Sequence, residues 1–91
     1  MALSISQKSS IESYKNQIQG LKNEIQRFRL EKKKVSERIS RELKNAKDAK
    51  EKESIRKSKA TSDHQIKVSI ESLTKSIERT RGYIQDIRSR A

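Results

Sequence analysis

The apolar residues of this chain recur at alternating intervals of three and four positions, and this spacing limits the fold more than any other feature. A 3.5-residue repeat places one apolar stripe along an α-helix and winds helices around each other. The first stripe consists of Ile11, Tyr14, Ile18, Leu21, Ile25, Phe28, Val35 and Ile39, with Lys32 in one slot. The second stripe consists of Ile66, Ile70, Leu73, Ile77, Thr80, Ile84 and Ile87. The sequence therefore predicts two amphipathic helices whose stripes are buried at helix–helix contacts.

The composition excludes a rounded globular core. Only 30% of the 91 residues are hydrophobic and 3% are aromatic, and the formal net charge is +11. Such a composition is typical of disordered chains, but nearly all of the scarce apolar residues fall in register. We therefore expect an all-α fold, an antiparallel coiled-coil hairpin formed as a single module over residues 1–91. A two-helix seam is thin, so we also expect the hairpin to oligomerise.

The position of the turn is read from helix-capping signals. Ser62 followed by Gln65 forms a capping-box pattern just before the second stripe, and Asp63 suits the dipole of a first helical turn. This pattern favours a helix over about 4–58, a turn at about 59–62 and a helix over about 63–89. The part of the first stripe from Ile11 to Phe28 then projects beyond the hairpin and needs a partner.

Two other arrangements fit the same repeat, because registers seven residues apart look alike. A turn near residues 46–50 pairs Ile11 with Ile87 and buries both stripes within one chain. Only Asn45 and Asp48 favour a turn there. A single unbroken helix in a parallel dimer is the third arrangement.

The sequence lacks the groups that catalysis requires. It has one histidine, His64, and no cysteine, and its carboxylates are spread through a surface rich in Lys and Arg. Such residues usually form salt bridges on helix surfaces. We expect no enzymatic activity, no cofactor, no metal and no small-molecule substrate. No apolar run is long enough for a membrane span, and the N-terminus lacks the apolar core of a secretory signal, so we expect a cytoplasmic protein.

The positive charge supports two interpretations. The candidate phosphate-binding residues are those of the densest basic segments, Lys32, Lys33, Lys34, Lys44, Lys47 and Lys50. In the first interpretation they bind nucleic acid with an affinity that falls with salt. In the second they keep a long helix in solution while interleaved Glu residues damp their repulsion. We favour the second, because Glu residues are mixed in throughout.

A central segment is similar to a known bacterial region. Its matching positions are Ser54-Ile55, Thr61-Ser62 and Gln65-Ile66-Lys67, followed by the second stripe. This segment, about a third of the chain, resembles the helical region that precedes the Toll/interleukin-1 receptor (TIR) domain in many bacterial proteins. In that family the TIR domain degrades NAD in antiphage defence and the helical region is thought to mediate association. The resemblance implies a scaffold, and it carries over no catalytic residue because the sequence contains no TIR domain.

We therefore expect a non-enzymatic coiled coil that forms a homo-oligomer or binds a helical protein partner. A basic helical nucleic-acid-binding protein is the second hypothesis. The third is a small helical hairpin that accompanies a toxin exported by a type VII system, although the Trp-X-Gly turn of the best-known members is absent.

Overall fold

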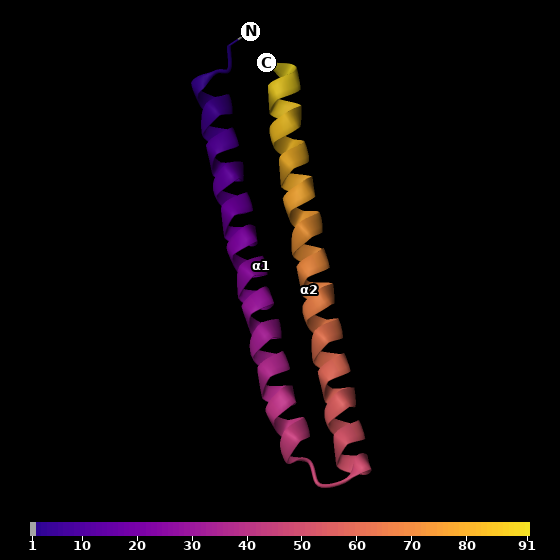
Figure 1. Cartoon of the computed structure of the whole chain (residues 1–91). Coiled ribbons are helices and arrows are strands. Elements are labelled where there is room, and N and C mark those ends of the chain that lie inside the picture. Colours follow the sequence, from indigo (N-terminus) through magenta and orange to yellow (C-terminus); the bar gives the residue numbers. More distant parts are fainter. Residues whose placement is uncertain (1) are drawn as a thin grey trace. The chain divides into compact units, whose positions relative to one another are not determined.

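The computed structural model describes residues 2–91 and consists of two long α-helices (Figure 1). Helix α1 spans Ile5–Asn45 and helix α2 spans Ala49–Arg90. Residues 46–48 connect them, and the described part of the chain contains no strand. The predicted all-α helical hairpin is thus confirmed.

Each helix begins at a side chain that caps its free backbone N–H groups. At the start of α1, the Ser4 Oγ accepts a hydrogen bond from the Gln7 backbone N–H at 3.0 Å. The Gln7 Oε1 accepts the Ser4 N–H at 2.9 Å in return. At the start of α2, the Asp48 Oδ1 accepts the Glu51 N–H at 2.7 Å. The Glu51 carboxylate accepts the Lys47 N–H at 3.1 Å. These reciprocal bonds fix where both helices start.

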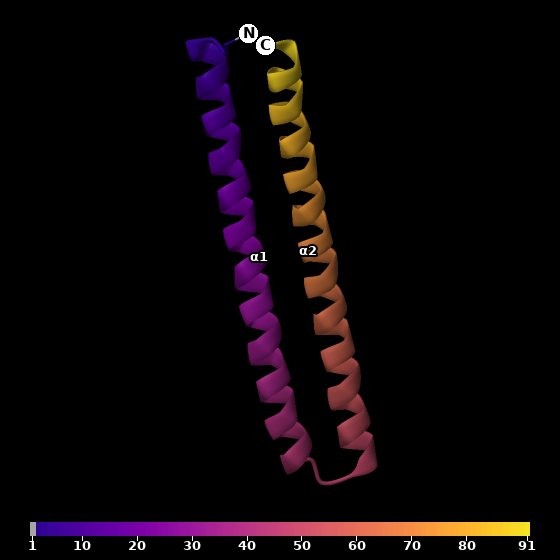
Figure 2. The same ribbon diagram turned by 45° about the horizontal axis from the view of Figure 1, so that its top comes forward.

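The predicted turn at 59–62 is wrong, and the chain instead reverses at 46–48. Figures 1 and 2 show α2 continuing without a break, and Ser62 and Gln65 lie inside it. The Thr61 hydroxyl donates to the Lys57 carbonyl at 3.1 Å, a bond made within a continuous helix. The physical reason is that Asp48 and Glu51 carry the same capping pattern as Ser62 and Gln65. A single unbroken helix is excluded as well.

The described residues form two compact units where the sequence predicts one module. Unit 1 contains residues 2–25 and 71–91, and unit 2 contains residues 26–70. Each unit is therefore built from one segment of α1 and one segment of α2. We call the line of contact between the two segments the seam of that unit.

In unit 1 the seam is filled by β-branched side chains from both segments. The buried residues are Ile11, Ile18, Ile25, Ile77, Thr80 and Ile84. Tyr14 and Tyr83 meet across the seam with their ring centroids 5.5 Å apart. This contact agrees with the register of a turn at 46–48. That register pairs Tyr14 with Ile84, the residue next to Tyr83 in the sequence.

In unit 2 the seam is less apolar. Val35, Ile39 and Ile66 are buried in it. On α2 the same seam contains an ion pair of 2.7 Å between Lys59 and Asp63. Charged residues occupy seam positions here because the second stripe begins only at Ile66. Unit 2 is therefore held by fewer apolar contacts than unit 1.

Candidate functional site

The seam residues predicted from the two stripes fall into two groups. The buried group comprises Ile11, Ile18, Ile25, Val35, Ile39, Ile66, Ile77 and Ile84. The half-exposed group comprises Tyr14, Leu21, Phe28, Ile70, Leu73 and Ile87. Both groups lie between segments of one chain, so the hairpin itself accounts for the burial of the first group.

The half-exposed group shows that the seams are only one layer deep. No large side chain among the described residues is completely buried, and the least exposed, Ile39, retains 2% of its surface. Two helices alone cannot surround a residue on all sides. Apolar surface at Leu21, Phe28 and Leu73 therefore remains in contact with solvent, although these side chains have no polar group that needs water.

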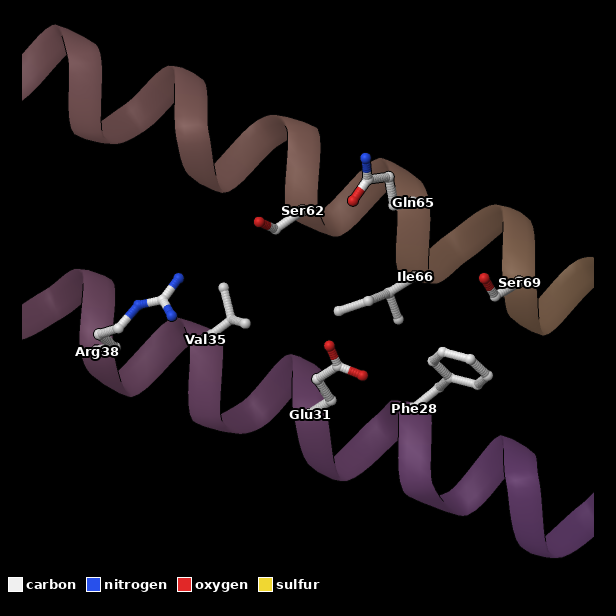
Figure 3. A pocket seen from close by; sticks show the side chains of 8 residues that line it. All are labelled: Phe28, Glu31, Val35, Arg38, Ser62, Gln65, Ile66 and Ser69. Carbon is white, nitrogen blue, oxygen red and sulfur yellow. The ribbon is translucent and has the colours of Figure 1, made fainter.

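A groove opens beside the seam of unit 2, with a volume of about 320 Å³. Figure 3 shows Phe28, Val35 and Ile66 pointing between the two helical segments. Ser62 and Ser69 line the α2 side, and their small side chains leave the groove open. We call this the serine groove; its lining residues are Phe28, Glu31, Val35, Arg38, Ser62, Gln65, Ile66 and Ser69.

The serine groove carries both signs of charge on its α1 edge. Glu31 forms no ion pair among the described residues, whereas Arg38 lies 3.8 Å from Glu42 on its own helix. Both Glu31 and Arg38 are exposed and able to reach a second molecule. The two apolar stripes do not predict this groove, although the sequence contains a signal for it in Ser62, Ser69 and Ser76, which recur every seven residues.

The six lysines predicted to bind phosphate do not gather into one patch. Lys32, Lys33 and Lys34 are exposed, and consecutive helical residues point about 100° apart, so these three face different directions. Lys44, Lys47 and Lys50 lie around the turn, among the carboxylates of Asp48 and Glu51. These lysines suit a solvated surface better than a single anion site.

A second groove, in unit 1, does concentrate positive charge. Lys15 from α1 and Arg81, Gln85 and Arg88 from α2 surround Ile84, and the groove has a volume of about 240 Å³. Lys15, Arg81 and Arg88 form no ion pair with any described residue. Runs of consecutive lysines do not predict this groove, because its cations are spaced along two helices. The signal was a seven-residue spacing, seen in Lys8, Lys15 and Lys22 and in Arg81 and Arg88.

Within residues 2–91, ion pairs do not join the two helices. Each ion pair in the described part of the chain links residues four apart on one helix, as Lys59 and Asp63 do. Such pairs stabilise a helix by only about 0.3–0.5 kcal/mol. Packing of the stripes, rather than charge pairing, therefore sets how the segments of each unit are held together.

Other chemistry is sparse in residues 2–91. His64 is an exposed residue within α2 rather than at its start, which corrects its predicted position. Among these residues no three His, Cys, Asp or Glu side chains come together in a way that could hold a metal ion. Neither α1 nor α2 has a stretch long and apolar enough to cross a membrane.

In comparisons with known proteins, no protein-family model, no curated protein and no solved structure matches this chain.

Proposed function

We propose that the chain is a self-association module, in which two or more hairpins pack together over their half-exposed seams. The observation that carries this proposal is the half-exposed group, with apolar side chains at Leu21, Phe28, Ile70 and Leu73 left partly in solvent. Covering such residues with a further helix pair removes apolar surface from water, which is worth about 25 cal/mol per Å². Small helical scaffolds commonly gain stability by this route.

The occupant of the serine groove that fits best is a second copy of the same groove. In a two-fold symmetric dimer, a residue at one end of the patch meets the residue at the other end of the partner's patch. Glu31 and Arg38 lie two helical turns apart on the groove edge. A two-fold axis between them would place each Glu31 beside the Arg38 of the other copy, with Val35 and Ile66 nearest the centre.

The wider role follows from the resemblance of residues 54–67 to TIR-associated helical regions. We extend the proposal accordingly: the module associates copies of a bacterial antiphage defence protein in the cytoplasm, or docks a helical partner, without catalysis or cofactor of its own. The turn at 46–48 leaves Thr61 and Ser62 inside α2. In this chain the resembling segment would therefore act as a packing surface rather than as a turn.

A matched pair of substitutions tests self-association. Phe28 is half-buried at the seam, whereas Leu30 is 54% exposed two residues later on the same helix. Phe28→Asp is expected to reduce the mass measured by light scattering to that of one chain, and Leu30→Asp is expected to leave the oligomer intact. Circular dichroism of both variants shows whether the helices persist.

Exposed charges give a second test that leaves the seam untouched. Glu31→Arg should weaken association about two- to thirtyfold, because it removes two symmetry-related exposed ion pairs, each worth about 0.2–1 kcal/mol. The double variant Glu31→Arg with Arg38→Glu should restore it. If the double variant associates no better than the single one, the two-fold arrangement is wrong. A single-chain mass for the wild-type protein at every concentration would reject self-association itself.

A further inference from the structure

The seam of unit 1 has two flanks of different charge. One flank carries Lys8, Lys15 and Lys22 on α1 and Arg81 and Arg88 on α2, and no carboxylate occupies these rows. We call these five residues the basic flank. Lys15, Arg81 and Arg88 line the unit 1 groove, and residues seven apart lie on the same side of a helix, which places Lys8 and Lys22 in line with Lys15.

The opposite flank of unit 1 differs in charge. Its rows contain Gln17 and Glu24 on α1 and Ser76, Tyr83 and Arg90 on α2, so it has one carboxylate and one cation, and Arg90 already lies 4.0 Å from Asp86 on its own helix. Flanking positions of coiled coils usually carry opposite charges that attract across the seam. In the basic flank, cation faces cation instead. Two rows of cations that repel each other are stabilised by an anion that binds between them.

The nearest acidic side chains do not neutralise the basic flank. Glu12 and Glu78 lie three residues before Lys15 and Arg81 on the same helices, and neither forms an ion pair with any described residue. All five cations of the basic flank are exposed. The groove therefore offers several free N–H donors to a ligand, including two guanidinium groups whose geometry matches two oxygens of one phosphate.

The length of the basic flank and the floor of the groove indicate the class of ligand. Lys8 and Lys22 are separated by about 21 Å along α1, which suits a chain of anions rather than one small ion. The floor is Ile84, which is only 7% exposed. An amphipathic helix of a partner would gain little there, because the apolar surface is already covered. A ligand that binds through charge alone fits better.

We propose that the basic flank of unit 1 binds the phosphodiester backbone of a nucleic-acid duplex. A duplex is favoured over a single strand because no aromatic side chain lines the groove to stack on unpaired bases. Contacts to phosphate oxygens carry no sequence information, so we expect binding that is independent of sequence. This activity goes beyond self-association, which uses the serine groove of unit 2, and a dimer would present two basic flanks.

Two triple variants with the same net charge test the proposal. The first is Lys15→Gln with Arg81→Gln and Arg88→Gln, and the control is Lys33→Gln with Lys34→Gln and Lys50→Gln. Both sets remove three exposed cations, so their helicity and oligomer mass should match those of the wild type. Binding to a short fluorescent DNA duplex is measured by anisotropy between about 50 and 200 mM salt. A single strand and polyglutamate serve as competitors.

The wild type and the control are expected to bind the duplex with an affinity that falls steeply with salt. The groove variant should bind at least about tenfold more weakly, and its log–log salt slope should be smaller by about 2–3, corresponding to three lost phosphate contacts. Competition by the duplex should exceed competition by the single strand and by polyglutamate. Equal losses in both triple variants, or no duplex binding at low salt, would overturn the proposal. If the wild-type protein is monomeric and still binds the duplex, the self-association proposal is rejected and the duplex-binding proposal stands.

Discussion

Tyr14 of α1 and Tyr83 of α2 meet across the seam of unit 1, with ring centroids 5.5 Å apart and ring planes inclined by 43°. Tilted aromatic pairs at this distance contribute about 0.5–1.5 kcal/mol beyond their buried area. The contact also reports the register, because it joins residues from the two ends of the chain. A turn at 59–62 would instead pair Thr80 with Ile39.

The register can be tested by thiol cross-linking, since the chain contains no cysteine of its own. The double variant Tyr14→Cys with Tyr83→Cys is expected to react within one chain when a short bis-thiol reagent is added at low protein concentration. Mass spectrometry identifies the linked peptides. The pair Ile39→Cys with Thr80→Cys serves as the control and should remain unlinked. Cross-linking of the control pair alone would support the turn at 59–62.

The cap that Asp48 forms at the start of α2 should contribute more to the free energy of unfolding than Ser62, which lies inside α2. Asp48→Ala removes the acceptor of the Glu51 N–H and is expected to lower the free energy of unfolding by about 1 kcal/mol. Ser62→Ala is the control, because Ser62 lies within α2 and caps no helix; it should have no effect or stabilise by a few tenths of a kcal/mol. Urea denaturation followed by circular dichroism measures both. A larger loss for Ser62→Ala would contradict the observed turn.

Thr80 is a buried polar residue in an otherwise apolar part of the seam, at 6% exposure. Its hydroxyl donates to the Ser76 carbonyl at 2.8 Å, so it makes no contact with α1 through a hydrogen bond. Thr80→Val is therefore expected to raise the free energy of unfolding by about 0.5–1 kcal/mol, because burial of the hydroxyl is avoided. Thr61→Val removes the same kind of bond at an exposed site and should change stability by less than about 0.5 kcal/mol. A destabilised Thr80→Val would show that the hydroxyl has a further role.

Asp63 weakens the seam of unit 2. Its Oδ2 pairs with Lys59 at 2.7 Å, whereas its Oδ1 is buried without a hydrogen-bond partner among the described residues. Asp63→Leu continues the second stripe by one slot and is expected to stabilise the protein by about 1 kcal/mol in thermal or urea unfolding. Asp86→Leu is the control, because Asp86 is 69% exposed in a long ion pair with Arg90 and should change stability little. Loss of stability in Asp63→Leu would indicate that the ion pair outweighs the buried oxygen.

The sequence predicts the helices well because helix type depends on one periodicity, which the few apolar residues follow closely. It does not determine the turn. Pairing Ile11 with Ile87, or shifting the register by several heptads, buries the same kinds of side chain. The capping pattern also occurs at both candidate turns, at Asp48 and at Ser62. The structure distinguishes the two by covering both stripes within one hairpin, a three-dimensional requirement that no local signal contains.

The candidate surfaces were less predictable than the helices. The stripes identify which residues approach the seam, but their exposure depends on how many helices surround them. Leu21 and Ile25 are similar in the sequence and differ in burial. Runs of consecutive cations such as Lys32 and Lys33 do not predict the basic flank. On a helix, charges gather into one surface when they recur every seven positions.

The most direct test of self-association is the mass of the wild-type chain in solution, measured by light scattering over a wide range of concentration at low and high salt. Burial of apolar seam residues such as Phe28 and Leu73 is not weakened by salt, unlike exposed charge pairing. We therefore predict a mass of at least twice that of one chain, retained at high salt. A helical chain that keeps the mass of a single copy at every concentration and salt would contradict the account.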